Sequence, residues 1–502
     1  MNTMLKGLKI IYIVCLSAIL IISCKKEVPV TPTPTPPVQP VPRTEEQLIK
    51  DSIYYYFKLY SLWEESIPTY KDISKFTDTI STSQAVLNNL KAKTPAYAAY
   101  AAYGGHYDRF SYFSDLDNVT GATSFLKMDK ADGYGIFISM GTIDSETAYP
   151  FIHMVEGGSP ASLVGLRRSD MILSLNNEDM KIAVTCTNGS CKAADPQKYN
   201  SILSTIRTAL SASSMKIKVE RNDNTVHSYN LIYKTYEVDP LLLDTVFKFS
   251  NKNVGYFAYS SFDQIKNDNG TFNENHQKLE QLFVNFSNQN IKDLIVDLRY
   301  NGGGYVDAAT YLADKIINSA GKGKLMLEYQ LNPYLTRWKS TSNNFKDVYF
   351  SKNNNLELET VCFIVSENTA SASEMLINVL KPYMNVKIVA EESATYGKPV
   401  GFFEQKIMNK IGLWVTSFKL LNGKGETDYW QGLTADKKNV TDYIFLDFGD
   451  KDERMIAAAL TYTGANTSSP LKASMQSSAR SSSRVMKKFG VVNQTEHKGA
   501  IK

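Results

Sequence analysis

The strongest constraint on the fold is a repeated order of buried strand, loop of small residues and helix that begins near residue 250. Residues 294–298 are a mostly apolar strand, Asn301-Gly302-Gly303-Gly304 follows as a loop, and residues 306–317 have a helical pattern. Residues 362–365 begin a second such unit. Units of this kind form parallel sheets that are covered on both faces. The sequence therefore predicts an α/β domain over residues 241–466, with its functional loops at the carboxyl ends of the strands.

Two smaller regions precede this domain. Thr44-Glu45-Glu46-Gln47 is typical of a capping box, and apolar residues at three- and four-residue spacing follow it, so residues 44–105 are predicted to be helical. Residues 106–240 contain short alternating segments separated by turn residues, which predicts a β-rich domain. The chain is thus expected to be an α/β protein of several domains.

Residues 1–23 are interpreted as an export signal. Two lysines precede an apolar run over residues 10–22, which is too short for an ordinary membrane span. The run ends at Ser23-Cys24 and resembles a bacterial lipoprotein signal, with an ordinary secretory signal and a chance cysteine as the alternative. The proline-rich residues 24–43 favour an extended tether. We therefore expect an exported protein, lipid-anchored to the bacterial membrane at Cys24 and facing the periplasm or the outside of the cell.

Export also permits disulfides. Cys186 and Cys191 flank Thr-Asn-Gly-Ser, which is a turn-forming sequence. A hairpin disulfide is favoured over a metal pair here, because no histidine or further cysteine is near in sequence.

The end of the chain has a different composition. Residues 467–502 are rich in serine and carry seven Lys/Arg against one Glu. Such a segment has too few apolar groups to form a core, so it is predicted to be a disordered tail.

Several classes of function are excluded or disfavoured. The formal net charge of +4 gives the whole protein no drive towards nucleic acid. The sequence has no Gly-x-x-x-x-Gly-Lys-Ser/Thr, no His-Glu-x-x-His and no Gly-x-Ser-x-Gly motif, and we expect no metal or nucleotide cofactor. Thirty tyrosines leave glycan capture at a surface as a minor alternative.

A histidine base and a β-lactamase-type site are both poorly supported. Of five histidines, only His276 lies in the α/β domain, at the start of a polar helix. Ser-x-x-Lys occurs by chance, for example at Ser319 and Lys322, because neither Ser-Asp-Asn nor Lys-Thr-Gly accompanies it.

Ser371 is the best candidate for a nucleophile. It lies in Thr369-Ala370-Ser371-Ala372-Ser373-Glu374, between a buried strand and a helix. Unpaired N–H groups and the dipole at a helix N-terminus favour a negative charge there, as an oxyanion needs. Taken alone, a serine that only caps the helix would explain the same residues.

Lys398 is the candidate base. It follows the next predicted strand, residues 386–389, and parallel strands end at the same edge of a sheet, so it is placed beside Ser371. A lysine accepts a proton near neutral pH only if burial lowers its pKa. An exposed lysine in a turn is the alternative for this segment alone.

The loop Asn301-Gly302-Gly303-Gly304 offers backbone N–H groups to a ligand. A dinucleotide loop is disfavoured, because Asp307 stands where the third glycine of Gly-x-Gly-x-x-Gly belongs.

Together these segments resemble the C-terminal processing (tail-specific) peptidase family. The shared order is Asp-Leu-Arg-x-Asn-Gly-Gly-Gly from Asp297, Thr-Ala-Ser-Ala-Ser-Glu around Ser371 and Tyr-Gly-Lys ending at Lys398. The resemblance implies a crotonase/ClpP-like core, Ser371 as nucleophile and Lys398 as general base. It implies an oxyanion hole made by the backbone amides of Gly303, or a neighbouring glycine, and Ala372. A Ser-Lys pair is a known variant of the serine-nucleophile scheme.

The β-rich region resembles the PDZ domain of such peptidases. Gly133-Tyr134-Gly135-Ile136 matches the loop that binds a peptide carboxylate, and Gly165 to Ile172 matches a later turn, although Ser169 stands at a usual glycine position. The helical region and the tether resemble lipoprotein members of the family from Bacteroidetes-like bacteria. The implied function is a serine endopeptidase that cleaves exported proteins and recognises the C-terminal regions of its substrates.

One departure keeps a second hypothesis open. Phe402 occupies the position four residues after the base, where the family often has a glutamine that orients the lysine. A catalytically inactive lipoprotein that binds peptides through its PDZ domain is therefore the alternative.

Overall fold

The computed structural model describes residues 42–115, 130–187, 190–341, 345–465 and 486–493. The predicted signal peptide, Cys24 and most of the tether lie outside these ranges. No helix within them is both long enough and apolar enough to cross a membrane. The chain divides into two units, Met1–Thr44 and Glu45–Lys502, and all the elements below belong to the second.

The α/β domain contains the parallel sheet that the sequence predicts. Its five strands lie in the order β12-β13-β14-β17-β18, and only β12 is antiparallel to its neighbour. The strands are β12 (Leu241–Lys248), β13 (Asn253–Tyr259), β14 (Asp293–Asp297), β17 (Thr360–Val365) and β18 (Asn385–Ala390).

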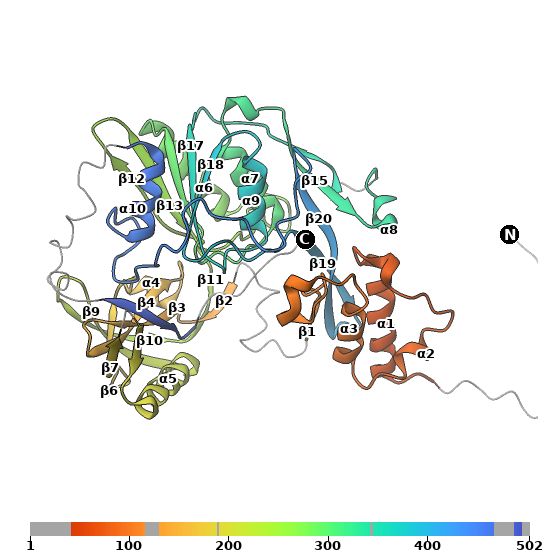
Figure 1. Cartoon of the computed structure of the whole chain (residues 1–502), viewed down its shortest axis with the longest axis horizontal. Coiled ribbons are helices and arrows are strands. Elements are labelled where there is room, and N and C mark those ends of the chain that lie inside the picture. Colours follow the sequence, from red (N-terminus) through yellow and green to blue (C-terminus); the bar gives the residue numbers. More distant parts are fainter. Residues whose placement is uncertain (1–41, 116–129, 188–189, 342–344, 466–485, 494–502) are drawn as a thin grey trace, which may run out of the picture. The chain divides into compact units, whose positions relative to one another are not determined.

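Helices cover both faces of this sheet (Figure 1). One face packs against three helices, α6 (Glu274–Asn288), α7 (Val306–Ile316) and α9 (Ala372–Leu380). The other face packs against α10 (Arg454–Leu460), and the free thiol of Cys362 is buried there. Because successive side chains of a strand point to opposite faces, strands covered on both sides must be apolar throughout.

A second, antiparallel sheet was not predicted from the sequence. Its order is β1-β20-β15-β16, and β19 also pairs with β20. The strands are β1 (Tyr112–Asp115), β15 (Leu325–Leu331), β16 (Val348–Tyr349), β19 (Val400–Ile407) and β20 (Ile411–Asn422). Tyr112 pairs with Trp414, so β1 joins the α/β domain although its sequence lies within the residues assigned to the β-rich domain.

The helical region is built on this second sheet. Its helices are α1 (Glu45–Tyr60), α2 (Ser74–Thr77) and α3 (Ser83–Lys91), and the 3₁₀ helices η1 (Glu64–Ser66) and η2 (Ala98–Tyr103) belong to it. Ile53 and Phe57 of α1 are fully buried against Leu413 and Val415 of β20. The apolar stripe of this helix is therefore core packing.

The β-rich domain is a nine-stranded sheet with the main order β10-β9-β5-β4-β3-β21. Its elements are β3 (Ile136–Thr142), β4 (Thr147–Val155), α4 (Pro160–Leu163), β5 (Met171–Leu175), β6 (Glu178–Asp179), β7 (Ile182–Thr187), β8 (Ser190–Ala193), α5 (Pro196–Ser211), β9 (Ser214–Glu220), β10 (Val226–Ile232) and β21 (Lys487–Val491). A separate pair, β2 (Lys130–Gly133) and β11 (Lys234–Glu237), adjoins it in sequence.

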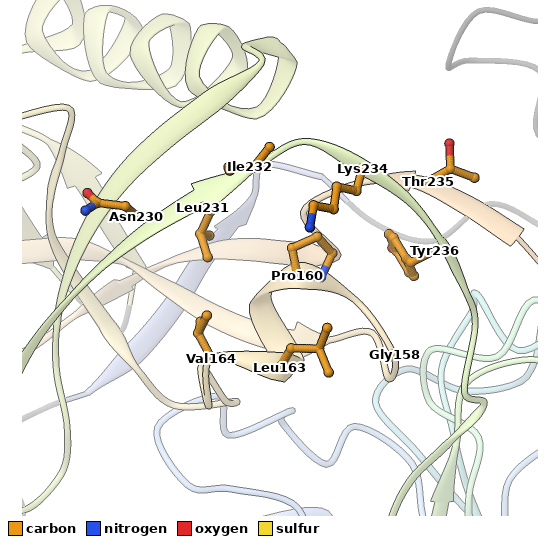
Figure 2. A pocket seen from close by; sticks show the side chains of 10 residues that line it. All are labelled: Gly158, Pro160, Leu163, Val164, Asn230, Leu231, Ile232, Lys234, Thr235 and Tyr236. Carbon is orange, nitrogen blue, oxygen red and sulfur yellow. The ribbon is translucent and has the colours of Figure 1, made fainter.

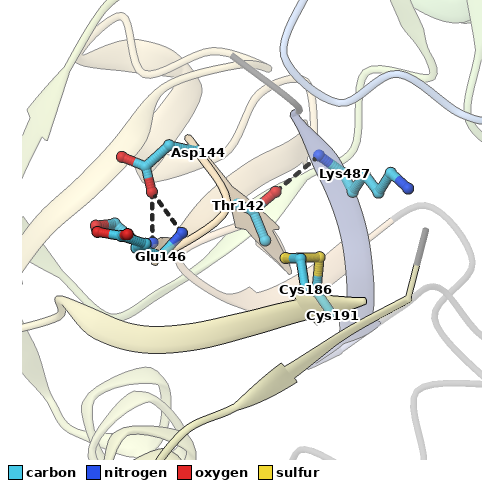
Figure 3. Close-up of a disulfide and its surroundings, with 7 residues drawn as sticks. Thr142, Asp144, Glu146, Cys186, Cys191 and Lys487 are labelled. Carbon is cyan, nitrogen blue, oxygen red and sulfur yellow. Dashed lines mark hydrogen bonds between the residues drawn. A yellow bond between two sulfur atoms is a disulfide. The ribbon is translucent and has the colours of Figure 1, made fainter. Parts of the chain in front are cut away.

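A hairpin disulfide and a strand from the tail belong to this domain. Cys186 and Cys191 form a disulfide across the β7–β8 hairpin (Figure 3). The tail differs from the prediction of disorder at one place, because residues 487–491 form β21 on the edge of β3. The sequence contains alternating apolar residues there, but its basic, serine-rich surroundings conceal them.

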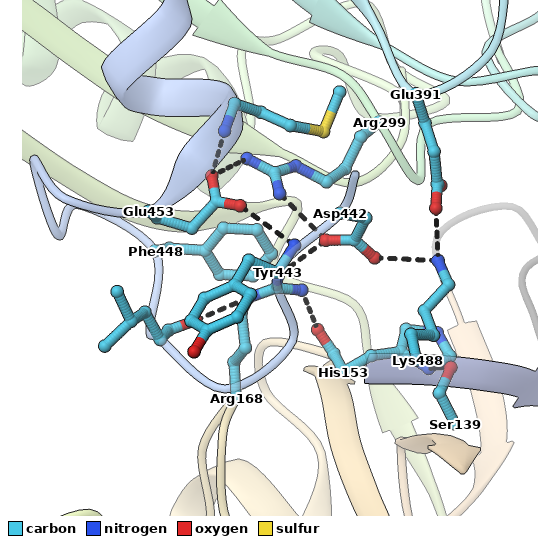
Figure 4. Close-up of polar contacts among 12 residues, drawn as sticks. Ser139, His153, Arg168, Arg299, Glu391, Asp442, Tyr443, Phe448, Glu453 and Lys488 are labelled. Carbon is cyan, nitrogen blue, oxygen red and sulfur yellow. Dashed lines mark hydrogen bonds and ion pairs between the residues drawn. The ribbon is translucent and has the colours of Figure 1, made fainter. Parts of the chain in front are cut away.

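A buried ionic network connects the β-rich domain to the α/β domain (Figure 4). Asp442 accepts hydrogen bonds from Arg168 at 2.6 Å, Arg299 at 2.9 Å, Tyr300 at 2.6 Å and Lys488 at 3.1 Å. Burial alone would raise the pKa of Asp442, but these cations hold it well below its usual range. Charges removed from water in this way are stable only while each has its partners.

We predict that Asp442→Asn lowers the free energy of unfolding by about 3–5 kcal/mol, because it leaves the buried Arg168 guanidinium without its carboxylate partner and removes one of the three carboxylates that bind Arg299. Denaturant unfolding of the full chain measures this. The matched control is Asp452→Asn at the surface pair with Lys451, which should change stability by less than about 0.5 kcal/mol. Equal stability of the two variants would contradict the role assigned to Asp442.

Candidate active site

Ser371 lies where β17 turns into α9, at the carboxyl end of the parallel sheet. Its backbone has φ 58° and ψ −116°, a conformation that residues other than glycine rarely adopt. Holding a residue there costs about 1–3 kcal/mol, so the surrounding contacts must fix it. Ala370 and Ala372 are buried on either side, and Ser371 itself is 8% exposed.

Lys398 lies in the loop after β18, the next strand of the sheet. The backbone N–H of Tyr396 in this loop donates to the carbonyl oxygen of Thr369, at 3.0 Å, which joins the Lys398 loop to the Ser371 loop. The structure therefore brings the two candidate residues to one edge, as the strand order predicts. No hydrogen bond between the Ser371 hydroxyl and the Lys398 ammonium is present in the described part of the chain.

Glu374 fixes the backbones of both residues. Its Oε2 accepts the N–H of Ser371 at 2.9 Å and the N–H of Lys398 at 2.8 Å. Its Oε1 accepts the hydroxyl of Thr395 at 2.6 Å and the N–H of Gly397 at 2.7 Å. The side chain is fully buried. Burial raises the pKa of Glu374, and the four donors oppose that rise.

The surroundings of Lys398 suit a base. Its side chain is 5% exposed, and burial lowers its pKa to about 7, with the charge of Arg109 acting in the same direction and that of Glu374 opposing it. Its ammonium lies 4.2 Å from the centre of the Phe402 ring. The face of an aromatic ring attracts a cation, so this contact favours the charged lysine and opposes the effect of burial. Phe402 therefore contacts the lysine at the position where the family often has glutamine.

Phe402 belongs to a small aromatic cluster. Its ring packs 5.5 Å from Tyr112 and 5.7 Å from Trp414, both on the second sheet. The antiparallel sheet, which was not predicted, thus supplies the aromatic side chains that bury the lysine.

Two residues that no sequence motif predicted support the Lys398 loop. Arg109 donates to the carbonyl oxygen of Tyr396 at 3.1 Å, and the hydroxyl of Tyr100 lies within hydrogen-bond distance of the carbonyl oxygens of Gly397, at 3.2 Å, and of Trp430. The guanidinium of Arg109 also lies 4.2 Å from the ring of Tyr100. Nearly 300 residues separate these partners in the chain, so no local motif could reveal them.

The candidate oxyanion donors lie close to Ser371. Asn301 connects the loops: its carbonyl oxygen accepts the hydroxyl of Ser373 at 3.1 Å and the N–H of Ala370 at 3.3 Å. Ala372 is the first residue of α9, where an N–H has no partner inside the helix. The N–H of Gly303, however, donates to the side-chain oxygen of Asn301 at 2.9 Å. The hydrogen bond between this N–H and Asn301 must break before the N–H can bind an oxyanion.

The loop of Gly133 to Ile136 lies in the β-rich domain, between β2 and β3. The carbonyl oxygen of Gly135 accepts the N–H of Glu156 at 2.9 Å. A side chain at Gly135 would meet Ser159 at 2.2 Å, and its φ is +70°, so only glycine fits. Among the described residues, no group of three or more histidine, cysteine or acidic side chains could hold a metal ion.

A pocket of about 370 Å³ lies elsewhere on the β-rich domain (Figure 2). Its lining includes Leu163, Ile232 and Tyr236, and neither Ser371 nor Lys398 belongs to it. It is therefore separate from the chemistry proposed for the α/β domain.

An α/β fold that presents a serine at the start of a helix beside a buried lysine is an arrangement that serine hydrolases use. Residues 253–438 match the family described as Peptidase family S41. This match confirms the resemblance of the α/β domain to the C-terminal processing peptidases.

Two relatives and one solved structure illustrate the likeness. Carboxy-terminal processing protease CtpA of Bacillus subtilis (strain 168) is 23% identical over 63% of this chain and 57% of its own length. A CtpA-like serine protease of Staphylococcus aureus (strain N315) is 23% identical over 56% of this chain and 48% of its own. The chain thus spans about half the length of these relatives. A crystal structure assigned to an S41 protease of Bacteroides fragilis NCTC 9343 shares the fold, with TM-score 0.59, 20% identity and coverage of 82% and 96% of the two chains.

We predict opposite shifts in the pKa of Lys398 for two charge changes. Arg109→Met removes a cation and should raise it, whereas Glu374→Gln removes an anion and should lower it. The lysine accepts a proton only when it is neutral, so the rate at which a fluorophosphonate modifies Ser371 should rise through about pH 7 in the wild type. The midpoint should move up in the first variant and down in the second.

Arg337→Met is the matched control, because Arg337 also lies over an aromatic ring, that of Tyr334, but is exposed. Its midpoint should equal that of the wild type. If all three variants have the same midpoint, Lys398 is not the group that titrates.

Proposed function

We propose that this chain is a serine endopeptidase that acts on exported proteins, with Ser371 as nucleophile and Lys398 as general base. One observation carries the proposal: a single buried carboxylate oxygen of Glu374 binds the backbone N–H of both residues. This contact fixes them beside each other at the ends of adjacent parallel strands. A lysine with a pKa of about 7 in that position is neutral often enough to accept a proton.

The proposed reaction proceeds through an acyl-enzyme. The Ser371 oxygen attacks the scissile carbonyl carbon as its proton passes to the nitrogen of Lys398, and the carbonyl oxygen becomes an oxyanion. Lys398 then gives the proton to the leaving amine as the peptide C–N bond breaks. Water, deprotonated by the same lysine, releases the acyl group and restores the serine.

The amides of Ala372 and the glycine loop stabilise the oxyanion in this scheme. Loss of one such donor costs about 10²–10³ in rate in other serine peptidases. Since the Gly303 N–H is held by Asn301 in the free protein, substrate binding must displace that side chain. Burial outweighs the attraction of the Phe402 ring for a cation, so Lys398 still loses its proton near pH 7 with Phe402 in place of a polar residue.

The β-rich domain serves, in our proposal, as a PDZ domain that reads the C-terminal end of the substrate. The glycine-rich loop around Tyr134 and Gly135 offers backbone N–H groups to a carboxylate, and a substrate strand would pair with the adjoining edge of β3 in place of β21. Export and a lipid anchor at Cys24 would place this activity at the membrane surface.

The second candidate is a catalytically inactive lipoprotein that binds peptides. Two observations favour it: Phe402 stands in place of the glutamine, and the Gly303 amide is engaged by Asn301. The two candidates differ in whether Ser371 reacts.

We predict that Ser371→Ala and Lys398→Ala each lower turnover of an unfolded protein by about 10⁴–10⁶-fold, because the two residues act as one unit. Turnover is measured by the appearance of new amino termini. Ser319→Ala and Lys322→Ala are matched controls from an exposed Ser-x-x-Lys and should retain wild-type turnover. Turnover that survives either of the first two substitutions would contradict the assignment.

We also predict that cleavage depends on a free substrate carboxylate. A peptide with an amidated C-terminus should have a lower kcat/KM than the same peptide with a free one, because the PDZ loop binds the carboxylate. Equal kcat/KM for the two peptides would refute recognition of the substrate carboxylate by the PDZ domain. It would not affect the roles of Ser371 and Lys398.

A further inference from the structure

The chain carries its own peptide on the edge of the β-rich sheet. Strand β21 pairs with β3 in antiparallel register, from Lys487 opposite Thr142 to Val491 opposite Ser139. The pairing continues beyond the strand, where the N–H of Val492 donates to the carbonyl oxygen of Ile138 at 2.9 Å. The segment thus runs along β3 towards the loop of Gly133 to Ile136.

Asn493 extends this pairing with its side chain. Its amide oxygen accepts the N–H of Ile138 at 2.8 Å, and its amide nitrogen donates to the carbonyl oxygen of Ile136 at 2.9 Å. An added peptide strand bonds to an edge in the same manner.

The segment lies between the edge of β3, with which its backbone pairs, and Tyr199 of α5, and this binding site is called the groove between β3 and α5 below. Phe489 packs against Tyr199 of α5, with ring centres 6.1 Å apart. Phe489 and Val492 both lie on the core of the domain without being fully buried in it. Met486 is buried against Phe445 and its neighbours.

Lys488 gives the segment a charge-specific contact. Its ammonium lies 2.7 Å from Glu391 and 3.1 Å from Asp442, both in the α/β domain. The lysine side chain is 16% exposed. Backbone pairing alone would accept any extended sequence, whereas these two ion pairs require a basic side chain at this position.

The sheet does not depend on this strand for its core. Every buried member of the main core of this domain lies between residues 134 and 231, in one continuous stretch of sequence. Strand β21 comes from the far end of the chain and covers an edge that would otherwise be open. Open edges accept extended peptides readily.

We propose that residues 486–493 are an intramolecular ligand of the groove between β3 and α5, and that they exclude peptide substrates until these displace them. The competing ligand is an extended peptide with a basic side chain followed by an aromatic one, at the positions of Lys488 and Phe489. The inference rests on the proposed peptide-reading function of this domain. Because the occupant is covalently attached, an external peptide must compete with a high effective concentration.

The test uses the full chain with Ser371→Ala, so that no cleavage complicates binding. The probe is a fluorescent synthetic peptide of residues 486–493, measured by anisotropy. The protein with Phe489→Asp has an attached segment that no longer fits the groove. The probe should bind to the protein with the unchanged tail at least about 10-fold more weakly than to this variant. Val491→Asp is the matched control, since Val491 is 48% exposed, and it should behave as the wild-type tail does. A probe with Glu in place of its second lysine should bind weakly to every variant.

Two outcomes would overturn the proposal. One is equal affinity of the probe for the protein with the unchanged tail and for the Phe489→Asp variant, including no binding to either protein. The other is hydrogen exchange at the Ile138 amide that is as fast in the wild type as in Phe489→Asp. If Phe489→Asp unfolds, a protease site inserted within residues 466–485 releases the segment from the intact protein. Failure of the probe to replace the released segment then refutes the proposal.

These readouts are independent of catalysis. A chain that binds the probe as expected but shows no turnover with Ser371 present would refute the peptidase and retain the intramolecular ligand. A chain that cleaves peptides but fails both binding tests would retain the peptidase and refute the intramolecular ligand.

Discussion

The candidate site depends on one buried carboxylate. Glu374 lies at the start of α9 with no exposure to solvent, and a carboxylate in that position is stable only if its oxygens are hydrogen-bonded. Its four donors come from Ser371 and from the loop of Thr395, Gly397 and Lys398. Bonds to a charged acceptor are roughly twice as strong as neutral ones, which offsets the unusual backbone at Ser371. The same carboxylate therefore builds the helix N-terminus, the serine turn and the lysine loop.

This geometry also sets the electrostatics of the lysine. An anion close to Lys398 favours its charged form, so burial must outweigh Glu374 for the pKa to fall to about 7. The second sheet provides that burial through Phe402 and its aromatic neighbours, and Arg109 adds a repulsive charge. The helical region and the second sheet are thus part of the candidate site, although neither holds a reacting group.

The sequence predicted the parts of the fold that local patterns encode. Strand, loop and helix recur along the chain, so the parallel sheet and the adjacency of Ser371 and Lys398 follow from strand order. The sheet of β1, β15, β16, β19 and β20 joins residues about 300 positions apart, and hydrophobic periodicity does not specify partners at that distance. Tyr100 and Arg109 were missed for the same reason. Strand β21 was missed because composition over 36 residues outweighed a five-residue pattern.

The position of Lys488 links the tail to the network that connects the domains. Asp442 is shared by Arg168 from the β-rich domain, Arg299 from the α/β domain and Lys488 from the tail. Arg299 also binds Glu453 at 2.9 Å and Asp297 at 2.7 Å. With Glu391 included, the cluster holds three cations and four carboxylates, so withdrawal of Lys488 leaves two cations against four. A buried excess of negative charge is costly, and a peptide that brings its own basic group avoids that cost. The charge balance of the network therefore disfavours an empty groove and favours exchange of one basic peptide for another.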